Sequence, residues 1–223
     1  MFERLNRAFQ QHLDPNRPLP QPRQPTVESL LPGDVVSFWD GGDNVVQAVL
    51  ECREELNRRE TVWRWNILDA GRVLEVSPEG NTLYDRTLIL HQTSAEFETL
   101  TADPEQGGVL KAFEARVRQG TAARNPTLFE YESSVYRVVS TGIFDARAVA
   151  QTGYPNLDVW RDINPDNPGD NVYFELEPTQ ETDDGPTDVL GIWTSHIALL
   201  FGRPLKAGDV QTIYPRSEEG QAT

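Results

Sequence analysis

Two stretches of this chain repeat each other position by position. Residues 94–100 read SAEFETL and residues 207–213 read AGDVQTI, so small, small, acidic, apolar, polar, threonine and aliphatic residues recur in the same order. Segments upstream of each copy also correspond, and the offset between them grows along the chain, as loop insertions in the second copy would make it. The pattern predicts an internal duplication, with chance similarity between two β-rich stretches as the alternative. Each copy is expected to form one helical turn that closes its unit.

The corresponding upstream segments are short, apolar and rich in β-branched and aromatic residues. They are 38–40 with 130–132, 62–64 with 159–161, 74–76 with 174–176, and 83–90 with 192–199. Short strands separated by turn residues favour a small barrel or a strongly bent sheet. The sequence therefore predicts a mainly β protein with minor α content, made of two tandem small β-barrel or bent-sheet units, residues 29–104 and 126–215. The run 189–201 is predicted to be a single strand of the second unit.

The segments outside the two units have their own patterns. Val109, Leu110, Phe113 and Val117 have the spacing of one helical face, so residues 105–125 are predicted to join the units through a helix. Residues 14–28 are rich in proline and are interpreted as an extended linker. The last residues, 216–223, are interpreted as a disordered tail.

A short amphipathic helix is predicted over residues 1–13. Its apolar stripe consists of Phe2, Leu5, Phe9 and Leu13. A helix of this length needs a surface to cover its stripe. It either docks on the body of this protein or binds a partner or a second copy of the chain.

Charge and composition exclude several classes of partner. The net charge of -15 argues against nucleic-acid binding and against adhesion to anionic lipid, because both need clustered Lys and Arg. Cys52 is the one cysteine, so no intramolecular disulfide is expected. No segment approaches the roughly 18 apolar residues that span a bilayer. Residues 1–12 do not resemble a signal peptide, so a cytoplasmic location is expected.

No residue pattern in this sequence points to a particular reaction. The chain lacks the Cys and His spacing of a zinc site, the phosphate-binding loops and the nucleophile elbow, so no enzyme activity and no cofactor are predicted. Cys52 lies in a predicted strand and is interpreted as a buried, inert thiol. His196 lies in an apolar predicted strand without a supporting pattern. Because carboxylates are plentiful, a hydrolase using Asp or Glu between the two units is the alternative.

One acidic loop, residues 162–171, has features of a calcium site. The candidate ligands are Asp162, Asn164, Asp166 and Asp170. The first three have the alternate spacing of an EF-hand loop, but Asn167 stands where that loop has glycine and Tyr173 where it has glutamate. Turn-forming composition explains the same residues, so an ordinary turn is the competing interpretation.

All five tryptophans fall in predicted strands. They are Trp39, Trp63, Trp65, Trp160 and Trp193. Trp63 and Trp160 correspond between the units, and each is followed by arginine, the second being Arg161. These residues either fill the cores of two small sheets or, with Arg161, form an exposed aromatic–arginine groove that binds a partner.

Three short motifs resemble a known family. They are Leu31-Pro-Gly-Asp34 with the strand after it, Trp63-Arg-Trp65, and Val73-Leu-Glu-Val76. Together they resemble an uncharacterised bacterial family, domain of unknown function 4178, over residues 29–92 and more loosely over 127–201, where the Gly-Asp opening is missing. The resemblance implies a non-catalytic accessory protein, associated with stress or defence systems, and supplies no catalytic residues. The predicted function is binding or scaffolding of a protein partner or a second copy, with no small-molecule ligand identified.

Overall fold

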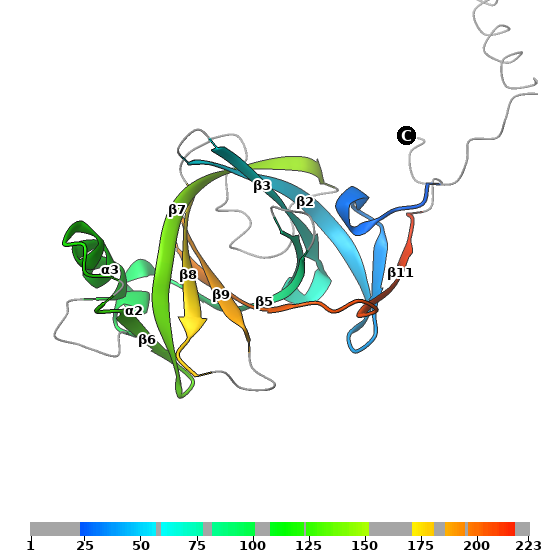
Figure 1. Cartoon of the computed structure of the whole chain (residues 1–223). Coiled ribbons are helices and arrows are strands. Elements are labelled where there is room, and N and C mark those ends of the chain that lie inside the picture. The colour runs from blue at the N-terminus through cyan, green and yellow to red at the C-terminus, as the bar shows by residue number, and fades with distance from the viewer. Residues whose placement is uncertain are drawn as a thin grey trace, which may run out of the picture.

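In the part of the chain that the structure describes, 11 strands form one continuous sheet, and most of them close into a barrel. The computed structural model describes residues 23–56, 59–77, 82–100, 108–122, 124–151, 171–180, 186–194 and 196–216. Eight strands close the barrel, because β2 pairs with β7 as well as with its other neighbours (Figure 1). The protein is therefore mainly β, as predicted.

Each half of the chain contributes four consecutive barrel strands. In the first half they are β2 (Gly42–Leu56), β3 (Arg59–Leu68), β4 (Arg72–Val76) and β5 (Leu83–Gln92). In the second half they are β7 (Ser134–Gln151), β8 (Asn171–Pro178), β9 (Asp188–Trp193) and β10 (Ile197–Pro204). Three further strands lie at the ends of the sheet, namely β1 (Val35–Phe38), β11 (Val210–Tyr214) and β6 (Thr127–Tyr131).

The two halves share a single barrel, whereas the sequence predicts two small units, each a β-barrel or a bent sheet. The halves meet along two antiparallel seams, β2 with β7 and β5 with β10. A bent sheet of four strands exposes two edges with unpaired backbone groups. Pairing the edges of one half with those of the other removes both edges at once, which a small four-stranded unit cannot do alone.

Side chains alternate between the barrel interior and two outer layers. The interior cluster, called here the barrel core, includes Leu50, Cys52, Trp65, Ile67, Val73, Phe144, Ile192 and Leu200. On the outside, α2 (Ser94–Glu98) and α3 (Val109–Arg118) lie with β6 on one flank, while β1, β11 and the short 3-10 helix η1 (Val27–Ser29) lie on the opposite flank (Figure 1). The outer face of the sheet is thus covered at these two flanks, and this explains why several strands read as apolar on both sides.

The helix predicted between the two halves is present as α3. Val109, Leu110 and Phe113 are buried, as the spacing predicts, but Val117 is 51% exposed. Arg116 is buried in its place and donates to the Thr127 hydroxyl at 2.9 Å. The last turn of the helix therefore faces β6 through a polar contact, which apolar periodicity does not reveal.

The run 189–201 forms two strands, so the prediction of a single strand is wrong. β9 ends at Trp193 and β10 begins at Ile197, and the backbone N–H of Thr194 donates to the carbonyl of His196 at 2.9 Å. His196 consequently lies between the two strands. Apolar residues on both sides of a short turn look continuous in sequence, because fully buried strands carry no alternation.

The two copies of the repeated heptad fold differently. Residues 94–98 form α2, whose N-terminus is capped reciprocally by Thr93 and Glu96, and its Phe97 is fully buried against Phe129 and Phe174. The second copy forms a turn and then β11, which pairs with β1. The predicted helical turn is therefore confirmed for the first copy and wrong for the second, where the free edge of β1 offers backbone partners.

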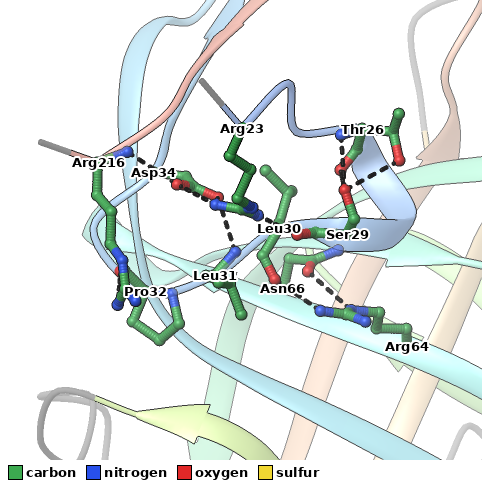
Figure 2. Close-up of polar contacts among 10 residues, drawn as sticks. All are labelled: Arg23, Thr26, Ser29, Leu30, Leu31, Pro32, Asp34, Arg64, Asn66 and Arg216. Carbon is green, nitrogen blue, oxygen red and sulfur yellow. Dashed lines mark hydrogen bonds and ion pairs between the residues drawn. The ribbon is translucent and has the colours of Figure 1, made fainter. Parts of the chain in front are cut away.

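Asp34 explains the Leu-Pro-Gly-Asp motif. Gly33 has a φ of 91°, a left-handed conformation that favours glycine, and it turns the chain so that the Asp34 carboxylate is fully buried. That carboxylate accepts from the backbone N–H groups of Leu31 at 2.8 Å and Arg216 at 2.9 Å, and from Arg23 at 2.8 Å (Figure 2). Asp34 thus joins both ends of the described chain to the start of β1.

Arg64, the arginine of the Trp-Arg-Trp motif, also binds the segment before β1. Arg64 points out of the barrel and donates from Nη2 to the carbonyl of Leu30 at 2.6 Å (Figure 2). Asn66, two residues along β3, donates to the carbonyl of Leu74 at 3.2 Å. The motif therefore alternates between tryptophans in the barrel and polar side chains that hold the outer layer.

Substitution of Gly191 by alanine is expected to lower the free energy of unfolding by about 1–3 kcal/mol. A Cβ at this position would lie 2.1 Å from the Phe174 ring, which is itself buried in the outer layer beside α2. Urea denaturation measures the change. If packing is the cause, adding Phe174→Leu should cost less in the Gly191→Ala background than in the wild type, and strictly additive losses would contradict it.

Candidate functional site

The polar residues inside the barrel gather at one end and line a cavity. Glu54, Thr61, Glu75, Arg86 and Glu175 supply polar groups, and Trp63, Tyr173 and Leu190 complete the walls. The cavity has a volume of about 220 Å³. Its lining comes from β2, β3, β4 and β5 of the first half and from β8 and β9 of the second. The site therefore exists only when the two halves close the barrel.

A buried ion pair forms part of the wall. Arg86 donates from Nε to Glu75 at 2.7 Å and from Nη2 at 3.1 Å, and the same Nη2 lies 2.8 Å from Asp188. Arg86 is 4% exposed and Glu75 7% exposed. Burial opposes the charge of Arg86, but the carboxylates of Glu75 and Asp188 outweigh it and raise the pKa of Arg86 above its usual value. Burial raises the pKa of Asp188 even though Arg86 lowers it.

Gly202 makes room for this ion pair. It is the strand partner of both Arg86 on β5 and Asp188 on β9. A Cβ on Gly202 would lie 2.7 Å from Nη1 of Arg86 and 2.9 Å from Oδ1 of Asp188, so the glycine lets the two side chains meet across β10. Within the described ranges, neither of these two atoms has a hydrogen-bond partner.

An aromatic wall faces the ion pair. Tyr173 donates its hydroxyl to Glu54 at 3.0 Å, across 119 residues of sequence. Trp63 lies edge-on to Tyr173, with ring centroids 6.2 Å apart. Burial, and then the charge of Glu54, raise the pKa of Tyr173 above its usual value. Tyr173 therefore stays protonated and remains a hydrogen-bond donor.

The cavity carries an excess of negative charge. Arg86 is already paired with Glu75 and Asp188. Glu54 accepts from Tyr173 and Glu175 accepts from the Ser140 hydroxyl, and within the part of the chain that the structure describes neither carboxylate forms a salt bridge to a basic side chain. Two carboxylates therefore face the cavity without a matching cation in those residues.

The described tryptophans that were candidates for a binding groove lie in different environments in the structure. Trp65 is fully buried and donates its indole N–H to Glu75 at 2.8 Å, so it cannot line an exposed groove and fills the core, as the competing interpretation holds. Trp63 is partly buried beside it and lines the cavity. Trp193 packs against the outer layer that holds α2 and α3, and Trp39 is 77% exposed in the turn after β1. Trp160 and Arg161 lie outside the described residues.

Other candidates fall outside the described residues or are confirmed as structural. The predicted docking stripe of Phe2, Leu5, Phe9 and Leu13 and the calcium candidates Asp162, Asn164, Asp166 and Asp170 all lie outside. Elsewhere, in the ranges that are described, no three His, Cys, Asp or Glu side chains come together to hold a metal ion. Cys52 is fully buried in the barrel core, as predicted, and burial raises the pKa of its thiol.

Two cavity residues, Glu75 and Glu175, stand in a sequence pattern that the sequence-based predictions did not use. Glu75 stands between Leu74 and Val76, and Glu175 between Phe174 and Leu176. An acidic residue between two apolar residues of a strand points into the barrel while its neighbours face the covered outer layer. Glu75 is buried, and charged residues are seldom buried unless they are paired or functional, so its triplet marks the site.

Comparisons with protein-family models, with curated proteins and with solved structures return no match. The resemblance to domain of unknown function 4178 accordingly stays a prediction. In the described part of the chain, no helix is both long enough and apolar enough to cross a bilayer.

Proposed function

We propose that this protein binds a small molecule inside its barrel. The observation that carries the proposal is the cavity of about 220 Å³, lined by a buried ion pair, by two carboxylates that form no salt bridge within the described residues, and by two aromatic rings. Eight-stranded barrels have interiors just wide enough for side chains or for one small ligand. Polar groups that converge on one cavity, beside groups with shifted pKa values, are typical of ligand sites.

The size of the cavity limits the ligand. Pockets for drug-sized molecules span about 300–1,000 Å³, which is more than this barrel offers. A small metabolite fits better than a lipid or a nucleotide. The apolar end of the barrel is already filled by side chains of the barrel core, so the ligand occupies only the polar end.

We propose in addition that the two halves of the chain arose by internal duplication. Its support is that each half contributes one outer strand followed by a meander of four, β1 to β5 and β6 to β10, in mirrored order around the sheet. The two halves then supply opposite walls of one cavity. On this view, joining the two copies created the site.

The functions predicted from the sequence, partner binding and hydrolysis, remain alternatives to this proposal. Trp39 remains an exposed anchor available to a protein partner or a second copy of the chain. Glu54 and Glu175 come from different halves and face one cavity, which is the arrangement that the hydrolase alternative requires. Turnover of a bound compound, lost in Glu54→Gln and Glu175→Gln, would favour that alternative over binding alone.

A small-fragment screen by ligand-observed NMR tests the proposal. Fragments that bind the wild type are expected to lose binding in Thr61→Tyr, because Thr61 lines the cavity and the added ring fills it. Thr87→Tyr is the matched control, since Thr87 is exposed on the outside of β5. Equal binding by both variants, or no binding fragment at all, would contradict a site in the barrel.

A further inference from the structure

The charge around Arg86 argues against an anionic ligand. The guanidinium is engaged by Glu75 through two hydrogen bonds and by Asp188 at 2.8 Å. Two carboxylates already more than balance its single charge. An additional anion would meet net repulsion and would lose its hydration without compensation.

The opposite wall attracts a cation. Glu54 and Glu175 each accept one hydroxyl hydrogen bond, and each carboxylate has lone pairs left for a ligand. The rings of Trp63 and Tyr173 stand beside them, and aromatic rings attract organic cations through their negative faces. Among the described residues no three acidic, His or Cys side chains are grouped for a metal, so the arrangement suits an organic ammonium group better than a metal ion.

Arg86 points to a second feature of the ligand. Its side chain is 5% exposed and lines the cavity, and its Nη1 has no hydrogen-bond partner in the described part of the chain. A buried donor of this kind needs an acceptor. Because the surrounding charge disfavours an anion, a neutral oxygen such as a hydroxyl satisfies it best.

We propose that the ligand is a small organic ammonium ion that also carries a hydroxyl group. This inference rests on the proposed small-molecule site. The ammonium group lies between Glu54, Glu175 and the aromatic rings of Trp63 and Tyr173. The hydroxyl oxygen accepts from Arg86. This class of ligand offsets the unpaired negative charge and uses the free donor of the buried arginine.

Isothermal titration with two nearly isosteric compounds tests the class of ligand. Choline carries the charge and the hydroxyl, and 3,3-dimethylbutan-1-ol replaces the ammonium nitrogen with carbon. Choline is expected to bind at least about tenfold more tightly, and its affinity should fall as salt is raised, because screening weakens the attraction.

Variants locate the charge that recognises the ligand. Glu54→Gln and Glu175→Gln each keep the shape of the wall and are expected to weaken choline binding about tenfold. Glu60→Gln is the matched control, since Glu60 is 52% exposed, pairs with Arg53 and lies outside the cavity. Melting curves of the ligand-free variants confirm that each one folds.

The outcomes separate this inference from the function on which it rests. If the neutral isostere binds as well as choline, or if Glu54→Gln and Glu175→Gln leave choline binding unchanged, the ammonium class is overturned while the barrel site stands. If neither compound binds but screened fragments do, the class is again overturned and the site stands. If nothing binds, both are overturned.

Discussion

Substitution of Arg86 by alanine is expected to lower the free energy of unfolding by about 4 kcal/mol, measured by urea denaturation near neutral pH. The arginine is 4% exposed and is held by Glu75 and Asp188. Its removal leaves two carboxylates side by side in the barrel without the charge that offsets their desolvation. Breaking a buried pair by removing one partner is among the most destabilising single changes in a protein.

This loss of stability should shrink as the pH falls. Burial raises the pKa of Asp188 in the wild type, and Arg86 is the group that lowers it. A carboxyl group with a higher pKa in the folded than in the unfolded state binds protons preferentially when folded. Its contribution to stability is complete below the unfolded-state pKa and is lost as the pH rises through the folded-state pKa. Arg86→Ala should therefore lie closer to wild type near pH 4 than near pH 7.

Two further variants serve as controls for Arg86. Arg86→Met with Glu75→Gln removes both charges but keeps an acceptor for Trp65, and it should recover part of the loss. Arg118→Ala removes an arginine that is 76% exposed and pairs with Glu114 along α3, so it should change stability by less than about 0.5 kcal/mol. Equal losses for Arg86→Ala and Arg118→Ala would show that the buried pair has no special role.

Substitution of Asp34 by alanine is expected to lower the free energy of unfolding by about 3 kcal/mol. The carboxylate is fully buried and accepts from Leu31, Arg216 and Arg23 (Figure 2). Alanine leaves these donors without an acceptor. The loss should be smaller than for Arg86, because Arg23 is 31% exposed and water can replace the carboxylate there.

Asp34→Asn distinguishes charge from hydrogen bonding at this position. Asparagine keeps one acceptor oxygen for a backbone N–H and should lose less than alanine. Hydrogen exchange of the Leu31 and Arg216 amides should quicken in Asp34→Ala, because both lose their acceptor. Asp43→Ala, at an exposed position of β2, is the control. Unchanged exchange and an unchanged unfolding midpoint in Asp34→Ala would refute the anchoring role.

Local pattern was enough to place several strands. Segments 62–64, 74–76, 83–90 and 174–176, which the sequence predicts to be short strands, lie in β3, β4, β5 and β8. These elements depend on contacts between neighbours in sequence. The break between β9 and β10 was missed because apolar residues continue on both sides of it, whereas the pairing of residues 210–214 depends on which sheet edge lies nearby.

Only part of the candidate site could be predicted from the sequence. Glu75 and Arg86 lie on adjacent strands of one hairpin, and a charged residue between apolar neighbours was visible in both matched triplets. The contact between Glu54 and Tyr173 could not be foreseen, since it spans 119 residues and forms across a seam. Tryptophan positions were equally ambiguous, because a strand pattern does not say which face becomes interior.

The sequence by itself determined that this chain is mainly β and that its two halves have related patterns. The tertiary structure alone decided that the halves share one barrel and that their acids meet in one cavity. The physical reason is that hydrogen bonds along the β2–β7 and β5–β10 seams satisfy exposed edges of each half. Any strand edge can accept such a partner, so only the closed structure shows which edges pair.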